Sequence, residues 1–131
     1  MNFIVYNVQG LNSRSLEVIE LVSKYDASFV ICTEVGEIWY KSSLPNFNIF
    51  HEKGTNKNGG VIIGVGKHLK ATKQETNLPN TLVVDICGLN EPLRVIGIYW
   101  PDSQKRDIND ISQYITGNTI VAGDFNATVS H

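Results

Sequence analysis

The stretch that decides the fold is Phe29-Val30-Ile31-Cys32-Thr33-Glu34-Val35. It is an almost unbroken apolar run, and a short run of this kind is typical of a strand that is covered on both faces. Cys32 lies in this run, and Cys87 ends a second one, Val83-Val84-Asp85-Ile86-Cys87. We therefore expect two reduced thiols in the core of an intracellular protein, and neither a disulfide framework nor a zinc site.

A helical pattern precedes this strand. Leu16, Ile19 and Val22 recur every three residues, and Val18 and Leu21 widen the apolar face, which predicts an amphipathic helix over about residues 15–24. Asn12 or Ser13 is expected to cap its N-terminus, because short polar side chains accept hydrogen bonds from the first backbone N–H groups of a helix.

Further β-rich runs lie on both sides. The residue patterns predict strands at 2–8, 29–35, 47–51, 61–65, 82–87, 93–99 and 119–122, and a second helix at about 103–115. Mixed sheets covered by helices, in an α/β or α+β layered fold, are the natural packing for this order of elements. Two helices cover little of such a sheet, so we expect part of the sheet surface to stay exposed.

Composition limits the class of protein. The chain has 131 residues, of which 42% are hydrophobic and 18% charged, a balance typical of one globular domain and too apolar for intrinsic disorder. Its longest apolar stretch, residues 61–66, is far shorter than the ~20 residues that a membrane span needs, and no signal peptide is evident. The net charge of −2 excludes a strongly basic nucleic-acid binder, so a polyanionic ligand must meet local positive charge or a metal ion.

Polar side chains gather where the predicted strands end. Asn7, Glu34, Tyr99 and Asp124 each stand at or just after the carboxyl end of a strand, where ligands of layered α/β folds commonly bind, and Asn126 follows two residues after Asp124. Carboxylate and amide oxygens without cysteine suit Mg²⁺ or Mn²⁺ rather than zinc.

Each of these features also has a purely structural interpretation. Asn7 can be a turn residue, Glu34 a solvated residue at a strand end, and Gly-Asp-Phe-Asn at 123–126 a turn. Their joint occurrence at the carboxyl ends of the predicted strands favours a functional site.

Four blocks, in this order along the chain, carry a family resemblance. They are Asn7-Val8-Gln9-Gly10-Leu11-Asn12; Ile31-Cys32-Thr33-Glu34; Gly59-Gly60-Val61 followed by Val95-Ile96-Gly97-Ile98-Tyr99-Trp100-Pro101; and Gly123-Asp124-Phe125-Asn126-Ala127. The sequence with these blocks resembles the endonuclease/exonuclease/phosphatase superfamily, most closely the endonuclease domains of non-LTR retrotransposons. The family more often has Gln where Thr33 stands.

The resemblance implies a four-layer α/β/β/α sandwich with mixed sheets and the helices outside. Residues 1–131 look like the N-terminal half of such a domain, because the family's C-terminal half carries a further Asp and a closing Asp-His pair. His131 stands too close to Asp124 to be that histidine. We therefore expect a single incomplete domain with little or no nuclease activity by itself. Its open sheet edges favour self-association.

The family's site residues can be carried over where this sequence matches. The resemblance implies that Asn7 and Glu34 hold or orient a divalent metal, Mg²⁺ or Mn²⁺. It implies that Asp124 orients or deprotonates the attacking water and that Asn126 and Tyr99 contact the scissile phosphate. The implied activity is metal-dependent hydrolysis of a phosphodiester, as in an endonuclease that nicks DNA, and the implied location is the nucleus if the host is a eukaryote.

A lysine-rich segment is the candidate DNA contact. Lys53, Lys57 and Lys67 belong to a stretch, residues 53–74, that contains several lysines and no acidic residue. This stretch is either a surface that follows DNA phosphates or simply a solvated face. Two further alternatives remain open: a phosphatase or phosphodiesterase of the same superfamily acting on a small ester, and a fragment without catalytic activity.

Overall fold

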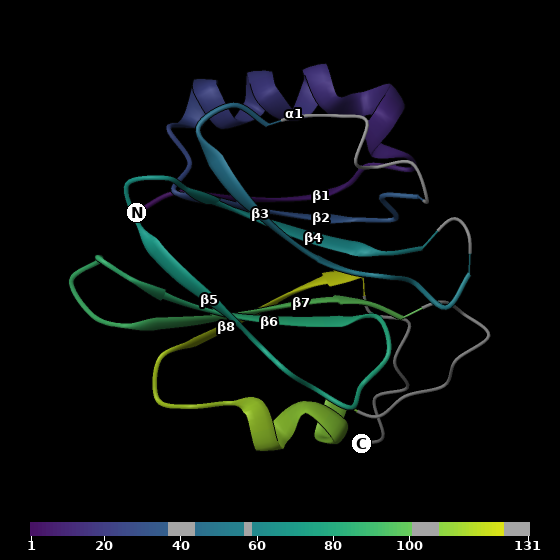
Figure 1. Ribbon diagram of the computed structural model, residues 1–131, viewed down its shortest axis with the longest axis vertical. Coiled ribbons are helices and arrows are strands. Elements are labelled where there is room, and N and C mark those ends of the chain that lie inside the picture. The colour runs from purple at the N-terminus through teal and green to yellow at the C-terminus, as the bar shows by residue number, and fades with distance from the viewer. Residues whose placement is uncertain (37–43, 57–58, 101–107, 125–131) are drawn as a thin grey trace.

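The computed structural model describes residues 1–36, 44–56, 59–100 and 108–124. These residues form two stacked four-stranded sheets with a helix outside each sheet (Figure 1). The elements, in chain order, are β1 (Phe3–Asn7), α1 (Leu11–Tyr25), β2 (Phe29–Thr33), β3 (Phe47–Glu52), β4 (Val61–Gly66), β5 (Lys70–Gln74), β6 (Thr81–Cys87), β7 (Leu93–Tyr99), the 3-10 helix η2 (Ile108–Tyr114) and β8 (Thr119–Asp124).

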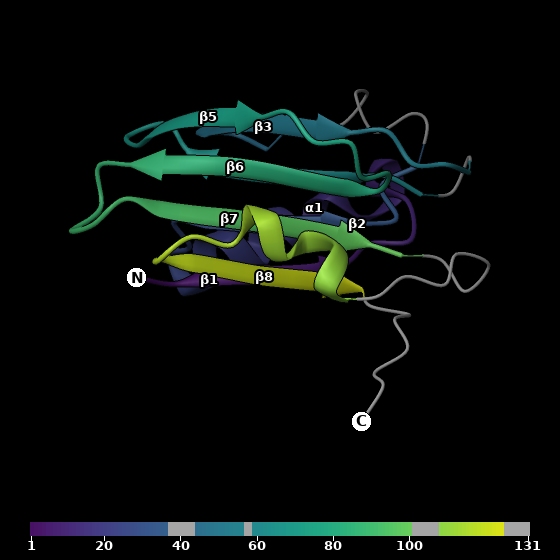
Figure 2. The ribbon, with the colours of Figure 1, turned by 90° about the horizontal axis from the view of Figure 1, so that it is seen from below.

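Both sheets are mixed, as predicted. The first sheet has the order β1-β2-β4-β3 and the second β5-β6-β7-β8. β1 runs parallel to β2 and β7 runs parallel to β8, whereas all other neighbours are antiparallel. Each parallel pair lies at one edge of its sheet, and the two pairs lie at the same edge of the sandwich (Figure 2).

Alternation along the strands builds three apolar layers. One core cluster fills the space between the sheets and includes Phe29, Ile31, Val84 and Val95. The opposite face of the first sheet packs on α1, and the opposite face of the second sheet packs on η2 around Trp100. The predicted order of helix, sheet, sheet and helix is therefore confirmed.

Helix α1 departs from its predicted start and, at Leu16, from its predicted apolar face. It begins at Leu11, because the preceding Gly10 is the N-cap residue, and no side chain caps it. The predicted caps are wrong, since Asn12 and Ser13 are already helical. Val18 is fully buried, as predicted, whereas Leu16 is 74% exposed. These two residues differ by about 200° around the helix axis, so they point to opposite sides.

Three other sequence predictions need correction. No strand is predicted at Lys70–Gln74, where β5 forms an edge strand with a largely polar sequence. The predicted helix at 103–115 is, in its described part, the shorter 3-10 helix η2, and Ile115 lies beyond its end. Cys32 is buried as predicted, whereas Cys87 is exposed at the last residue of β6, and both thiols are free.

The exposed apolar surface is smaller than predicted. The two inner sheet faces cover each other, and the outer faces pack on α1 and η2. Exposed apolar side chains in the sheets occur on the edge strand β1, at Phe3 and Val5. Within the described ranges, no helix is long and apolar enough to span a bilayer.

Candidate functional site

Asn7 and Asp124 meet across the two sheets. Asn7 is the last residue of β1 and Asp124 the last residue of β8, so 117 positions of sequence separate them. The side-chain nitrogen Nδ2 of Asn7 donates a 2.7 Å hydrogen bond to Oδ2 of Asp124. The sequence prediction that these residues share one end of the fold is confirmed by this contact.

The end of β8 is held in place by β7. Tyr99 pairs with Asp124 in the parallel ladder, and the backbone N–H of Trp100 donates a 3.0 Å hydrogen bond to the carbonyl of Asp124. Gly123 has φ 136°, and a Cβ at this position would lie 2.0 Å from the carbonyl oxygen of Ile98. Glycine is therefore required at this position by the neighbouring strand.

Glu34 lies at the same end, on a constrained bend just after β2. Its φ is 56°, a left-handed value that is uncommon for a residue other than glycine. The Glu34 carbonyl accepts a 2.8 Å hydrogen bond from the N–H of Gly10, and the N–H groups of Val35 and Gly36 donate to the carbonyls of Gly60 and Gly59. Backbone contacts on both sides thus fix the direction of this bend.

A hollow opens beside Glu34. It has a volume of about 250 Å³ and is lined by Gln9, Gly10, Glu34 and Gly36. Gln9 also has a left-handed φ, 48°, so two residues in uncommon backbone conformations border this space. Such conformations persist where the surrounding structure fixes them, and they concentrate at functional sites.

The donor chemistry at this end suits a hard divalent cation. Asn7 uses Nδ2 for its bond to Asp124, which leaves its carbonyl-type oxygen Oδ1 as an acceptor. Glu34 and Asp124 supply carboxylates, and oxygen-only donor sets of this kind are typical of Mg²⁺ and Mn²⁺. Among the described residues, no three His, Cys, Asp or Glu side chains form a ready metal cluster, so an ion here would depend on Asn7 and on ligands such as water or substrate.

The other predicted site residues are placed as follows. Tyr99 is half-buried at the end of β7 and packs against the core between the sheets. Lys53 is exposed directly after β3, whose last residue Glu52 pairs with Val61 at the site end of the sandwich. Lys67 lies at the opposite end, where its N–H donates to the carbonyl of Asn46, so it does not share a surface with Lys53. Asn126 and Lys57 lie outside the described residues.

Two polar residues at this end are not among the predicted site residues. Asn80 is fully buried just before β6, and it pairs with Thr55 in the loop after β3. His51 lies half-buried near the end of β3, and the pKa of its imidazole is lowered to about 4 by burial and by the charge of Lys73. The only sequence signal for Asn80 is an asparagine directly before a strand, which is a common turn residue.

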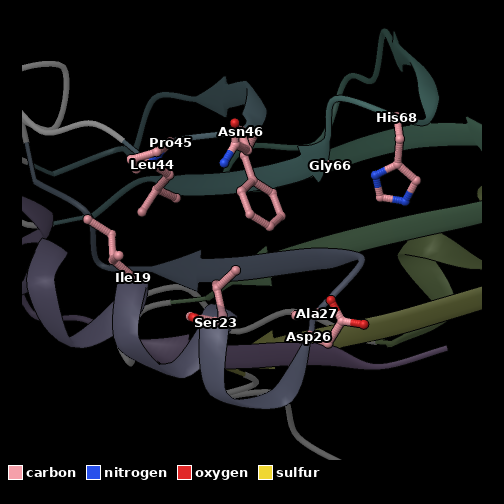
Figure 3. Close-up of a pocket in the computed structure, with 11 residues that line it drawn as sticks. Ile19, Ser23, Asp26, Ala27, Leu44, Pro45, Asn46, Gly66 and His68 are labelled. Carbon is pink, nitrogen blue, oxygen red and sulfur yellow. The ribbon is translucent and has the colours of Figure 1, made fainter.

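Larger cavities lie at the opposite end of the sandwich. One of about 400 Å³ lies between the C-terminal part of α1 and the segment before β3, with Ser23 and Asp26 on one wall and Asn46 and His68 on the other (Figure 3). Another of about 730 Å³ is lined by residues that include Met1, Leu89 and Asn118. No predicted site residue lines either cavity.

Comparisons with known proteins identify the family and support the fold. Residues 4–131 match the model of the Endonuclease/Exonuclease/phosphatase family. No curated protein sequence matches this chain significantly. The endonuclease domain of TRAS1, a telomere-specific non-LTR retrotransposon, has a similar structure, with a TM-score of 0.71 and 15% identity over 95% of this chain and 60% of that one.

Two further solved structures are similar. A humanized TDP2 of D. rerio has a TM-score of 0.66 and 16% identity, covering 92% of this chain and 64% of that chain. The 3'-5' exonuclease NExo from Neisseria meningitidis has a TM-score of 0.58 and 16% identity, covering 94% of this chain and 57% of that chain. The chain thus spans less than two thirds of the length of each of these structures.

Proposed function

The chain belongs to the endonuclease/exonuclease/phosphatase family, and on that premise we propose that it is a divalent-metal-dependent phosphodiesterase that nicks DNA as part of a retrotransposon-type protein. The observation that carries the proposal is the 2.7 Å hydrogen bond between Asn7 and Asp124. It joins the carboxyl ends of β1 and β8, at the same end of the sandwich as the fixed bend of Glu34. In a eukaryotic host, the proposed place of action is the nucleus.

The proposed roles follow from the chemistry of each side chain. Asn7 and Glu34 hold the cation, Mg²⁺ or Mn²⁺, through oxygen atoms. When bound, the ion supplies positive charge that stabilises the negative charge developing on the phosphate and on the leaving oxygen. The proposal needs no cysteine or histidine ligand.

Asp124 is the proposed water-orienting group. Because Asn7 donates to Oδ2, the carboxylate has a fixed direction, and its other oxygen is the proposed acceptor for a proton of the attacking water. The water oxygen bonds to phosphorus as the bond to the departing sugar oxygen breaks. Tyr99 and Asn126 donate hydrogen bonds to the phosphate in this proposal.

DNA is the proposed substrate. The TRAS1 domain is an endonuclease of a retrotransposon, and TDP2 of D. rerio has been solved with a single-strand DNA product. Lys53, exposed at the site end, is the proposed contact to a DNA phosphate. Lys67 is not carried into this proposal, because it lies at the opposite end.

A small phosphate ester is the second candidate substrate. ANGEL2, one of the similar structures, is a 2',3'-cyclic phosphatase, and its TM-score to this chain is 0.54. The fold is therefore compatible with either substrate, and the site must decide between them.

The test offers both substrates to the same protein. Supercoiled plasmid and inositol polyphosphates are incubated with the chain in Mg²⁺ and in Mn²⁺, and nicked circles and released phosphate are measured. We expect nicked circles, at a low rate because the chain spans about 60% of the length of the TRAS1 domain. Phosphate release without nicking would favour the second candidate. The absence of both, with no bound metal, would refute the enzymatic proposal for this chain.

Two substitutions then separate the roles. In a version of the protein extended to the full family domain, Asp124→Asn should lower the nicking rate by about 10²–10⁴-fold with little change in metal affinity, because it removes a positioned base. Glu34→Gln should weaken metal binding, and raised Mg²⁺ should partly restore nicking. If raised Mg²⁺ restored Asp124→Asn and not Glu34→Gln, the two roles would be reversed.

A further inference from the structure

Asn80 is a polar side chain buried where the two sheets meet at the site end. Its exposed fraction is 0%. Its Oδ1 accepts a 3.1 Å hydrogen bond from the N–H of Thr55, and its Nδ2 donates a 3.1 Å hydrogen bond to Oγ1 of Thr55. An amide buried this deeply is tolerated because it is hydrogen-bonded, so removing a partner is costly.

The same residue also holds the strand that ends in Tyr99. The backbone carbonyl of Asn80 accepts a 3.0 Å hydrogen bond from the N–H of Tyr99. Asn80 has φ 57°, a left-handed conformation that asparagine adopts more readily than most residues. One residue therefore links the loop that follows β3 in the first sheet to the end of β7 in the second.

This loop packs directly on the Tyr99 ring. A Cβ added to Gly59 would lie 3.3 Å from Cε2 of Tyr99 and 3.1 Å from Oδ1 of Asn56. A side chain larger than glycine at position 59 would therefore require the Tyr99 ring or the Asn56 side chain to shift by a few tenths of an ångström. A shift of the loop would move or release the ring.

The loop also supports the bend of Glu34. The carbonyls of Gly59 and Gly60, at its far end, accept the N–H groups of Gly36 and Val35, with N–O distances of 3.0 and 3.4 Å. These are the two residues that follow Glu34. Hydrogen bonds and packing therefore connect Asn80 through one loop to both Tyr99 and Glu34.

We propose that Asn80 is a positioning residue of the site, which sets the mutual placement of Tyr99 and the Glu34 bend through its pair of hydrogen bonds to Thr55. This proposal rests on the proposed function, since it assigns Tyr99 and Glu34 to one site. In this proposal Asn80 has no direct contact with substrate or metal. It acts through the loop.

The test changes the partner of Asn80, because Thr55 is exposed and lies outside the strands. Thr55→Val keeps the shape of the side chain and removes the hydroxyl that accepts from Asn80. Thr55→Ser keeps the hydroxyl. Asn80→Gly removes the side chain and still permits the left-handed backbone conformation.

Two readouts report on the site in the full 131-residue chain. The first is the NMR spectrum of the metal-free protein, in which the Tyr99 ring and the amides of Gly36 and Gly59 are followed. The second is the affinity for Mn²⁺, measured from water-proton relaxation. The matched control is Asp85→Asn, which breaks a 2.7 Å ion pair with Arg94 on the opposite face of the second sheet.

The proposal predicts a specific pattern. Thr55→Val and Asn80→Gly should shift the Tyr99, Gly36 and Gly59 signals and weaken Mn²⁺ binding by about tenfold, as is typical when a supporting hydrogen bond behind a metal ligand is lost. Thr55→Ser, which keeps the hydroxyl, should leave the NMR signals and the Mn²⁺ affinity as they are in the wild type. Asp85→Asn should lower the melting temperature and leave both readouts unchanged.

Other patterns would overturn it. If Thr55→Val lowered the melting temperature as Asp85→Asn does and left the three NMR signals in place, Asn80 would have only a role in stability. If the NMR signals shifted and the wild-type chain bound no Mn²⁺, the proposed metal site would be wrong, whereas the link from Asn80 to Tyr99 would stand.

Discussion

Replacing Asn7 with aspartate should destabilise the chain near neutral pH and make its stability depend on divalent cations. The substitution places a second carboxylate where the Asn7 nitrogen now lies 2.7 Å from Asp124 Oδ2. At a separation of about 2.7 Å, two unit charges repel by about 1.5 kcal/mol in bulk water and by about 6 kcal/mol at an effective dielectric constant of 20.

The expected loss lies toward the lower of these limits. Asn7 is exposed, so water screens the charges and the side chains are able to rotate apart. With the lost hydrogen bond included, we expect the free energy of unfolding to fall by about 2 kcal/mol. For a chain of this size, that corresponds to a fall in Tm of roughly 6–10 °C.

Thermal melts followed by circular dichroism measure this effect. The control is Asn48→Asp, which adds the same charge at an exposed position of β3 away from the site. At about pH 4, the Asn7→Asp variant should recover much of its lost stability, because a proton on either carboxyl removes the repulsion. Mg²⁺ should raise its Tm more than that of the wild type, since a cation between two carboxylates offsets their charge. If Asn7→Asp melted like Asn48→Asp near neutral pH, the Asn7–Asp124 contact would not exist in solution.

Three further predictions follow from single features. Cys87 should react with a thiol reagent in the folded chain and Cys32 only after unfolding, because burial raises the pKa of Cys32 to about 12; equal labelling of both in mass spectra would contradict this. Burial and the Lys73 charge lower the pKa of His51 from 6.5 to about 4, so the unfolded chain binds a proton first and stability should fall as pH decreases through this range. Denaturant unfolding at several pH values should show that the stability of His51→Gln depends less on pH than that of the wild type. An unchanged pH dependence would show that His51 is not the group responsible. The exposed apolar edge strand β1 should cause concentration-dependent self-association in light scattering, and a monomer at every concentration would argue against it.

Strongly apolar strands could be predicted from the sequence because burial on both faces leaves a clear pattern. Phe29–Thr33 and Val61–Gly66 are buried at every position, and both are predicted within two residues of their ends. β5 is an edge strand with partly exposed, polar side chains, and it is held by backbone hydrogen bonds to β6. Its sequence therefore carries little signal, because hydrogen bonds to a neighbouring strand require no particular side chain.

The start of α1 shows how tertiary contacts decide a boundary. The N–H groups of Gly10 and Leu11 donate to the carbonyls of Glu34 and Val35, more than twenty positions later in the chain. These contacts satisfy two of the free backbone donors at the helix N-terminus and fix where the helix begins without a capping side chain. A local search for Asn or Ser caps therefore places the start too late.

The placement of the site residues could be predicted only in part. Residues at the carboxyl ends of predicted strands are expected to gather at one end of a layered fold, and Asn7 and Asp124 do so. The separation of the lysines could not be foreseen, because Lys53 lies before β4 and Lys67 directly after it, and β4 carries the chain from one end of the sandwich to the other. The linking role of Asn80 can be recognised only in the folded structure, since its partner Thr55 lies 25 positions away in the sequence.

The most direct test of the account is a Mn²⁺ titration of the wild-type chain, Glu34→Gln and the control Glu91→Gln by isothermal calorimetry. Glu91 is exposed in the connection between β6 and β7, at the end of the sandwich opposite the site. We expect that the wild type binds Mn²⁺, that Glu34→Gln weakens binding by at least about tenfold, and that Glu91→Gln leaves it unchanged. Equal affinity in the wild type and Glu34→Gln, or no binding to the wild type, would contradict the proposal that Asn7, Glu34 and Asp124 form one metal-dependent site.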